Sequence, residues 1–283
     1  LVAHTLTHGY QTLPIVAILS GLLILVAFFF HLDKYIIFIP RSVVHGFTLG
    51  VAFIIGLGQL DSAFGLTNIE KTDNFLENIL ITLGHLGEAR WGIFLIFILS
   101  TLFMVFWNKK FPKIPSAAIV AFSSIGLILL FSVLGYATPI LTLGDKYPSI
   151  QATLFANPFQ GFSWSLLLQR DIWMISFATA VVAILETLLS GQIADGMTKT
   201  KFVRSKEVFG LSIANIGSGL MGGIPATAAL ARTALNVKSG ATHKISGVIS
   251  AVLVAIITLF FFGLFKLLPM VIISAILAVV AIG

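Results

Sequence analysis

Two charged residues stand apart from the other charges in this sequence, because their neighbours are apolar or small. Glu186 lies in the run AVVAILETLLS, and Arg232 lies in the run PATAALARTAL. A charged side chain inside a membrane segment is costly and commonly marks a pathway for ions or protons. We therefore take Glu186 and Arg232 as the first candidates for chemistry.

Glu186 has a hydroxyl neighbour at helical spacing. Ser190 follows it at i+4, which puts both side chains on one face of a helix. A carboxyl group there can carry a proton, so the pair predicts a site for a coupling ion. The structural alternative is that Glu186 only forms a hydrogen bond between two helices.

The segment that carries Arg232 has the pattern of a broken helix. Gly222-Gly223 interrupts the preceding apolar run, and Pro225 suits the first turn of a helix, where its missing N–H is not needed. We predict a short helix that begins near Pro225–Ala229 and ends near residue 237. Crossing a bilayer takes about 20 residues, so this helix is too short to span it.

The start of such a helix can bind an anion. Its first N–H groups have no partner within the helix, and they lie at the positive end of the helix dipole. Arg232 adds a permanent positive charge less than one turn further on. The residues before it have small side chains, which let a ligand approach the backbone: Ala226, Thr227, Ala228 and Ala229. The structural alternative is a re-entrant hairpin in which Arg232 pairs with Glu186.

The elements that must position these residues are membrane helices. The chain has 283 residues, of which 58% are hydrophobic and 10% charged, whereas roughly 25% are charged in soluble domains. This composition excludes a soluble enzyme and a nucleic-acid-binding protein. The apolar runs are continuous, which predicts an all-α polytopic membrane protein rather than a barrel. They lie near 13–32, 43–60, 91–107, 116–136, 172–190, 208–222, 245–265 and from 267 onward.

The distribution of Lys and Arg predicts an orientation. If each segment crosses once and the first ends in the cytoplasm, eleven basic residues face the cytoplasm and five face outward, as the positive-inside rule requires. The inner residues are Lys34, Arg41, Lys109, Lys110, Lys113, Lys199, Lys201, Arg204, Lys206, Lys238 and Lys244. The outer residues are Lys71, Arg90, Lys146, Arg170 and Lys266.

Three runs of this sequence resemble the sulfate permease (SulP) family of anion transporters, which is related to vertebrate anion exchangers and prestin. They are ETLLSGQIADGMTKTKFVRSKEVFGLSIANIGSGLMGGIPATAALARTALNVKSGA, IPRSVVHGFTLGVAFIIGLGQL and LLPMVIISAILAVVAIG. The resemblance implies a 7+7 inverted-repeat fold with a core and a gate domain, and a substrate site at the broken half-helices three and ten. It makes 43–136 mainly gate helices and 172–265 mainly core helices.

The resemblance also assigns roles to single residues. Glu186 matches an acidic residue associated with proton coupling, and Glu186 with Ser190 keeps the spacing of a cation-binding pair in sodium-coupled relatives. Arg232 matches a basic residue beside the bound anion. The backbone donors at the start of half-helix ten match Ala229, Leu230 and Ala231. Some relatives carry Ser at position 231, so this chain offers the anion one hydroxyl fewer.

The match covers only part of the family fold, from about helix four to helix twelve. Residues 1–283 thus form a partial membrane transport domain without helices one to three, thirteen and fourteen. The STAS domain, which would be an intramolecular partner, is also outside this chain. We expect a multi-pass protein of the inner membrane that forms a homodimer. We expect neither nucleic acid nor a metal as a partner, and the chain is not an enzyme because no nucleophile–base pair is evident.

These observations predict secondary active transport of a small anion by an elevator-type alternating-access mechanism. Sulfate, bicarbonate, chloride and dicarboxylates all suit a site of backbone N–H groups and Arg232. A proton at Glu186 is the expected coupling ion, and sodium is the alternative. Two other functions stay open: an anion channel or anion-gated membrane motor, and a nucleobase permease of the same fold.

Overall fold

The computed structural model of this chain describes residues 9–282 except 33, 35–40, 68, 73, 113, 137–138, 150 and 160–161. Lys113 of the predicted inner group therefore lies outside the described residues. The described part is built from helices and has no strand, only an isolated antiparallel bridge between Thr142 and Pro269. The predicted all-α fold is confirmed.

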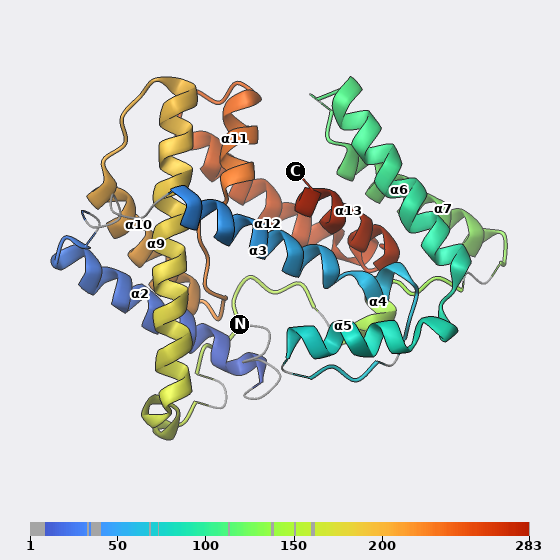
Figure 1. Cartoon of the computed structure of the whole chain (residues 1–283), viewed down its shortest axis with the longest axis horizontal. Coiled ribbons are helices and arrows are strands. Elements are labelled where there is room, and N and C mark those ends of the chain that lie inside the picture. Colours follow the sequence, from blue (N-terminus) through green and yellow to red (C-terminus); the bar gives the residue numbers. More distant parts are fainter. Residues whose placement is uncertain are drawn as a thin grey trace. The chain divides into compact units, whose positions relative to one another are not determined.

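The described part of the chain contains ten longer helices and five short helical segments (Figure 1). The longer ones are α2 (Leu13–Phe29), α3 (Arg41–Leu57), α5 (Phe75–Gly84), α6 (Trp91–Lys110), α7 (Ser116–Val133), α9 (Arg170–Thr198), α10 (Arg204–Leu220), α11 (Leu230–Lys238), α12 (Ile245–Phe265) and α13 (Met270–Ile282). The short ones are η1 (Tyr10–Thr12), α4 (Leu60–Ala63), η3 (Leu86–Glu88), α8 (Leu143–Lys146) and η4 (Trp164–Leu168).

Each of the predicted apolar runs contains a helix. Five helices in the described part are long and apolar enough to cross a membrane, and they fall at Tyr10–Phe29, Trp91–Lys110, Ser116–Val133, Arg170–Thr198 and Ile245–Phe265. α5 lies outside the predicted apolar runs. It is only 10 residues long and carries Glu77, and its start depends on Asn74, whose side chain accepts the N–H of Leu76.

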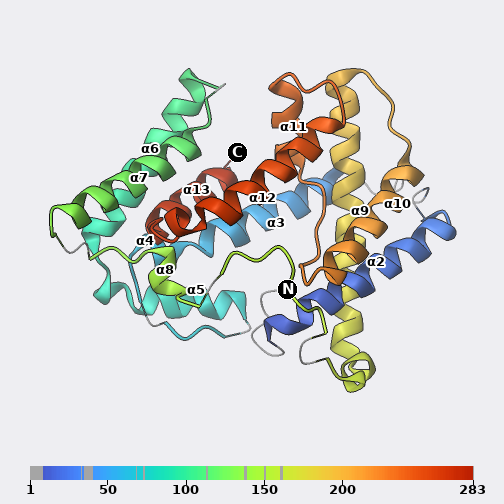
Figure 2. The same cartoon turned by 180° about the vertical axis from the view of Figure 1, so that it is seen from behind.

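The chain divides into two compact units. Unit 1 comprises 1–40 and 153–254, and it contains α2, α9, α10 and α11. Within it, α2 packs along α10, and both contact α9. The two views in Figures 1 and 2 show α2 and α10 side by side. The candidate site residues all belong to this unit.

Glycine lets α2 and α10 approach until their backbones touch. A Cβ atom on Gly21 would lie 2.7 Å from Ile216 Cγ1 and 2.8 Å from Ile216 N. A Cβ atom on Gly219 would lie 2.5 Å from the carbonyl oxygen of Pro14 and 2.6 Å from Ile18 Cγ1. Small residues at such a crossing are a usual means of packing membrane helices.

Unit 2 comprises 41–152 and 255–283, and α13 is its central helix. α13 contacts α3, α6 and α7. The loop around α8 binds the turn before α13 through the backbone: Leu143 N–H donates to Leu268 O at 2.9 Å, and Met270 N–H donates to Leu141 O at 2.9 Å. The buried core of this unit includes Ile93, Met104, Val120, Ile125, Val271, Ile272 and Ala275.

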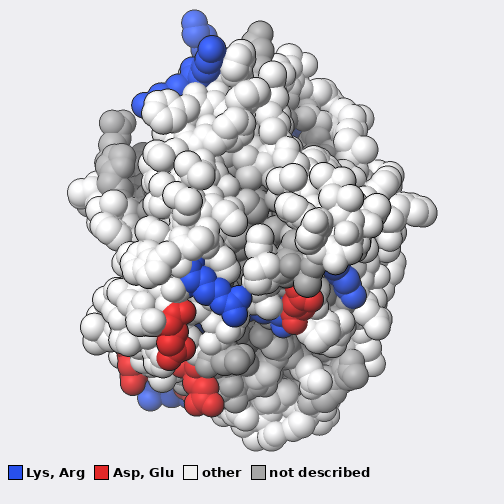
Figure 3. Space-filling model, turned by 90° about the vertical axis from the view of Figure 1, so that its right-hand side faces the viewer, with Lys and Arg blue, Asp and Glu red and all other residues white. Residues whose placement is uncertain are grey.

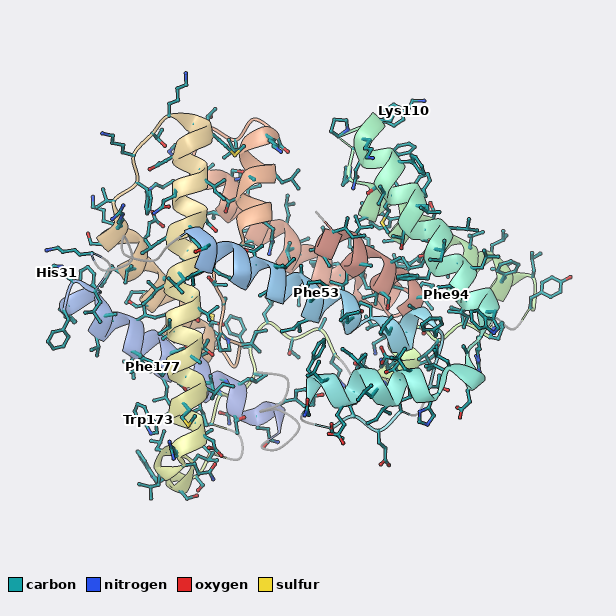
Figure 4. The ribbon with its side chains drawn as sticks, viewed as in Figure 1. His31, Phe53, Phe94, Lys110, Trp173 and Phe177 are labelled. Atoms are coloured by element: carbon teal, nitrogen blue, oxygen red, sulfur yellow. The ribbon has the colours of Figure 1, made fainter. Side chains whose placement is uncertain are left out.

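Apolar side chains dominate the surface. The face in Figure 3 is largely uncharged, with its acidic and basic side chains confined to small groups. Trp173 and Phe177 on α9 and Phe53 on α3 are exposed aromatic residues (Figure 4). α12 has no buried residue at all. A lipid environment accounts for this surface, because exposed apolar area of this extent is unfavourable in water.

Candidate functional site

α9 supplies the acidic part of the candidate site. The helix runs uninterrupted from Arg170 to Thr198 and ends at Lys199, which adopts the left-handed conformation. Glu186 is half-buried near its middle, and the adjacent Thr187 is 7% exposed. One turn further on, Ser190 is 2% exposed. The predicted pair of Glu186 and Ser190 therefore lies on one continuous helix.

The segment before α11 differs from the prediction. α11 begins at Leu230 with Ala229 as its N-cap, and residues 223–229 are not helical. α11 thus begins one residue beyond the predicted range Pro225–Ala229, and its end agrees with the prediction within one residue. The cause is that side chains of α9 and α10 satisfy the backbone groups of this segment in an extended form.

Asn215 of α10 is the first of these side chains. Its Oδ1 atom accepts the N–H of Ala226 at 2.9 Å, and its Nδ2 atom donates to the carbonyl oxygen of Ala226 at 2.9 Å. Nδ2 also donates to Leu211 O at 3.0 Å. Sequence reasoning missed Asn215, although a lone amide inside the apolar run 208–222 was a signal that could have identified it.

Two threonines attach the same segment to α9. Thr187 Oγ1 accepts the N–H of Ala228 at 3.3 Å and lies 3.3 Å from Thr227 Oγ1. Thr227 Oγ1 also donates to the carbonyl oxygen of Ala183 at 3.1 Å. The Thr227 hydroxyl lies close enough to the Glu186 carboxyl group to interact with it. Thr227 therefore links the acidic residue on α9 to the segment that leads into α11.

A tight turn directs the chain from α10 into this segment. Gly222 has a φ of 78°, and a Cβ atom on it would lie 2.5 Å from the carbonyl oxygen of Ala156. Ser218 Oγ donates to Ile224 O at 2.8 Å across the turn. The glycines of the sequence motif thus serve a left-handed turn and a close backbone contact, both of which exclude larger residues.

The buried hydroxyl of Ser190 has no hydrogen-bond partner among the described residues. Buried polar atoms are usually paired, so an unpaired one needs an explanation. Ser190 lies at i+4 from Glu186, on the same face of α9. The arrangement leaves a hydroxyl oxygen near the carboxylate with its hydrogen-bonding capacity unused.

Arg232 occupies the third position of α11, and its side chain is exposed. Within the described part of the chain it forms no ion pair with Glu186, so the proposed structural pairing of these residues is not observed. The first-turn N–H groups of α11 have no helical acceptor, as at any helix start. Nothing is described of the side chains of Leu230 and Ala231, which were predicted to contribute only backbone donors.

The described part of unit 2 contains two further features, an apolar cavity and an ion pair of a buried aspartate. A cavity of about 460 Å³ between α6, α7 and α13 has a lining of apolar side chains and serines, without a charged residue. Asp61 is 8% exposed and forms an ion pair with Lys71 at 2.9 Å. Among the described residues, no group of three or more His, Asp or Glu could hold a metal ion.

Comparison with known proteins gives a consistent result. A sequence model described as "Sulfate permease family" matches residues 1–283. The chain is 32% identical to "Putative sulfate transporter YvdB" of Bacillus subtilis (strain 168), over 97% of this chain and 51% of that protein. It is 26% identical to "Bicarbonate transporter BicA" of Synechocystis sp., over 92% of this chain and 44% of that protein. The chain thus spans about half the length of these relatives.

Solved structures show the same fold. The transmembrane domain of a cyanobacterial bicarbonate transporter, BicA, superposes with a TM-score of 0.83 at 25% identity, over 100% of this chain and 70% of that one. SLC26A9 superposes with a TM-score of 0.80 at 16% identity, over 97% of this chain and 43% of that one. The sequence match and the fold agree with the resemblance inferred from the motifs. The chain therefore belongs to the sulfate permease family, a family of transporters and not of enzymes.

Proposed function

We propose that the full-length chain carries out secondary active transport of a small anion across a membrane. The observation that supports this most directly is the arrangement around Thr227. Its hydroxyl donates to the carbonyl oxygen of Ala183 on α9, three residues before Glu186, and its backbone belongs to the segment that ends at the start of α11. A site for a coupling ion and a site for an anion are thus joined by one residue.

The anion site consists of the start of α11 and Arg232. Backbone N–H groups of Ala229, Leu230 and Ala231 would donate to the anion, and Arg232 would neutralise its charge. The small residues of 226–229 leave the backbone accessible. Sulfate, bicarbonate, chloride and dicarboxylates all suit such donors, and the names of the relatives favour sulfate or bicarbonate as the first anions to test.

The coupling site consists of Glu186 and Ser190. An ionised Glu186 repels an anion nearby, and a proton on its carboxyl group removes that repulsion. Binding of the proton and of the anion would then favour each other. Sodium is the alternative, because the carboxylate of Glu186 and the unused hydroxyl of Ser190 are oxygen ligands on one helical face.

The remaining features of the proposal concern the whole protein. An elevator-type movement requires two bodies that are each compact, and the division of the chain into units 1 and 2 is compatible with that requirement. The inner membrane as location, a homodimer, and a STAS domain beyond this chain are expectations from the family. No nucleobase site is proposed, because the residues that lead into α11 are mostly alanine.

Uptake into proteoliposomes tests the function and the coupling ion. The full-length chain should accumulate labelled sulfate or bicarbonate when an inward proton gradient is applied. Glu186→Gln should abolish the dependence on that gradient, whereas Glu88→Gln, at an exposed carboxyl group in unit 2, should retain it.

Other outcomes of this experiment discriminate between the alternatives. Accumulation that follows a sodium gradient instead would assign the coupling site to sodium. Flux that equilibrates the anion without accumulation under either gradient would indicate a channel. Wild-type pH dependence in the Glu186→Gln protein would show that Glu186 is not the proton site.

A further inference from the structure

Residues 223–229 form a non-helical segment whose backbone is bound by side chains of other elements. It pairs with no strand in the described part of the chain, so no sheet fixes its backbone. Instead, both backbone polar groups of Ala226 bind Asn215, and the N–H of Ala228 binds Thr187. α10 thus binds the segment at Ala226, and α9 binds it at Ala228.

The chemistry of Asn215 suits this task. A side-chain amide donates and accepts at once, so it can pair with a peptide unit as a neighbouring strand would. Burying an amide among apolar residues is unfavourable unless it is hydrogen-bonded. Asn215 is 1% exposed, and its amide is used for Ala226 and Leu211. The N–H and the carbonyl oxygen of Ala226 also determine which side of the Asn215 amide carries Oδ1 and which carries Nδ2.

We propose that Asn215 is a positioning residue for the anion site. It does not touch the anion; it fixes Ala226, three residues before Ala229, which is the N-cap of α11. The direction of the first N–H groups of α11 then depends on the bonds at Ala226. Sites of this kind need their donors held within about 0.5 Å. This inference rests on the proposed anion transport.

If Asn215 positions the segment, its loss should weaken anion binding. Loss of an ordinary buried polar residue should only lower the stability of the protein. Without its amide, the N–H and carbonyl oxygen of Ala226 lose their partners, and Thr187 cannot replace them because it accepts from Ala228. The segment then samples several conformations, and only some present the donors correctly. The anion should bind more weakly to a protein that is still folded.

The test measures KM and Vmax for sulfate and bicarbonate uptake by the full-length chain in proteoliposomes. Asn215→Leu has a side chain of similar size without hydrogen-bonding groups, and we expect its KM to rise about tenfold. Asn215→Thr is uncharged and retains a hydroxyl that can accept the N–H of Ala226, so its KM should lie between the wild-type and Leu values. Thermal unfolding of each purified variant reports the folded fraction.

Ser212→Ala is the matched control. Ser212 is also on α10 and 0% exposed, but its hydroxyl donates to Phe209 O in its own helix at 2.7 Å. Its KM should equal that of the wild type. A wild-type KM in folded Asn215→Leu would overturn the inference, and if that variant does not fold, a wild-type KM in Asn215→Thr would do so. A wild-type protein that takes up neither anion would instead contradict the proposed function.

Discussion

At the scale of single residues, the structure gives the two unusual charges of the sequence different surroundings. Glu186 is half-buried on α9 and interacts with Thr227, whereas Arg232 is exposed on α11. Neither forms an ion pair within the described part of the chain. This separation is compatible with the proposal that Glu186 binds a coupling ion and Arg232 lies beside an anion.

Arg232 and Lys238 form a matched pair for testing the charge at the anion site. Both are exposed on α11, but Arg232 is in its first turn and Lys238 is its last residue. Arg232→Gln should raise the KM for the transported anion by about tenfold or more, because a hydrogen bond to a charged group contributes about 1.5–3 kcal/mol. Lys238→Gln should change the KM less than twofold by the same measurement of uptake. Equal effects of the two substitutions would show that only net charge matters.

At the scale of elements, the helices in the long apolar runs were predictable, but α5 and the contacts between helices were not. Apolar runs of sufficient length must become helices in a bilayer, because their backbone groups have no other partner. Which glycines pack against a neighbour depends on how helices cross. Glycines are frequent in the run 43–60, yet nothing described lies within 4 Å of a Cβ atom built on Gly46 or Gly50. The tight contacts are at Gly21 and Gly219 instead.

The close crossing of α2 and α10 predicts that alanine substitutions at two glycines of α10 have different effects on the free energy of unfolding. A Cβ atom on Gly219 would overlap Pro14 and Ile18, whereas one on Gly217 meets nothing within 4 Å. Gly219→Ala should lower the free energy of unfolding by about 1–3 kcal/mol. Gly217→Ala should be neutral or raise it by up to about 1 kcal/mol. Thermal unfolding of the purified protein measures both, and a stable Gly219→Ala protein would contradict this packing.

The short helix α8 predicts a dependence of stability on pH. Hydrogen bonds from the hydroxyl and backbone N–H of Thr142 lower the pKa of Asp145 below its ordinary value of 3.8. A lowered pKa in the folded state means that the contribution to stability is complete above the ordinary value and is lost as the pH falls through the lowered one. The stabilised loop binds the turn before α13 in unit 2.

Asp145→Asn should therefore destabilise the protein at neutral pH by about 0.5 kcal/mol, a small value because Asp145 is largely solvated. The difference from the wild type should disappear as the pH approaches the lowered pKa of Asp145. Thermal unfolding across pH measures it. Thr142→Val should also destabilise the protein, and the two losses should not add fully in the double variant, because both substitutions remove the bond between the Thr142 hydroxyl and the Asp145 carboxylate. Additive losses would argue against the shared capping interaction.

At the scale of the whole molecule, the distribution of basic residues predicts a single orientation in the membrane. The chain contains no cysteine, so introduced cysteines can be labelled without background from residues 1–283. Lys201→Cys should react with a membrane-impermeant maleimide only after the cells are permeabilised. Glu88→Cys should react in intact cells. The reverse pattern would invert the topology, and the unsubstituted protein is the control for labelling elsewhere.

The sequence by itself determined that the chain lies in a lipid bilayer, that its fold is all-α and which family it belongs to. It also singled out two charged residues in apolar surroundings, Glu186 and Arg232. Those properties follow from composition and from local runs, because a bilayer leaves an apolar segment little choice but a helix. Only the tertiary structure decided where α11 begins and which polar side chains hold the segment before it. Asn215 and Ala226 are 11 residues apart, and Thr187 and Ala228 are 41 apart. A proline after two glycines favours a helix start by local propensity, but hydrogen bonds from two other helices outweigh that preference, and no local pattern can reveal them.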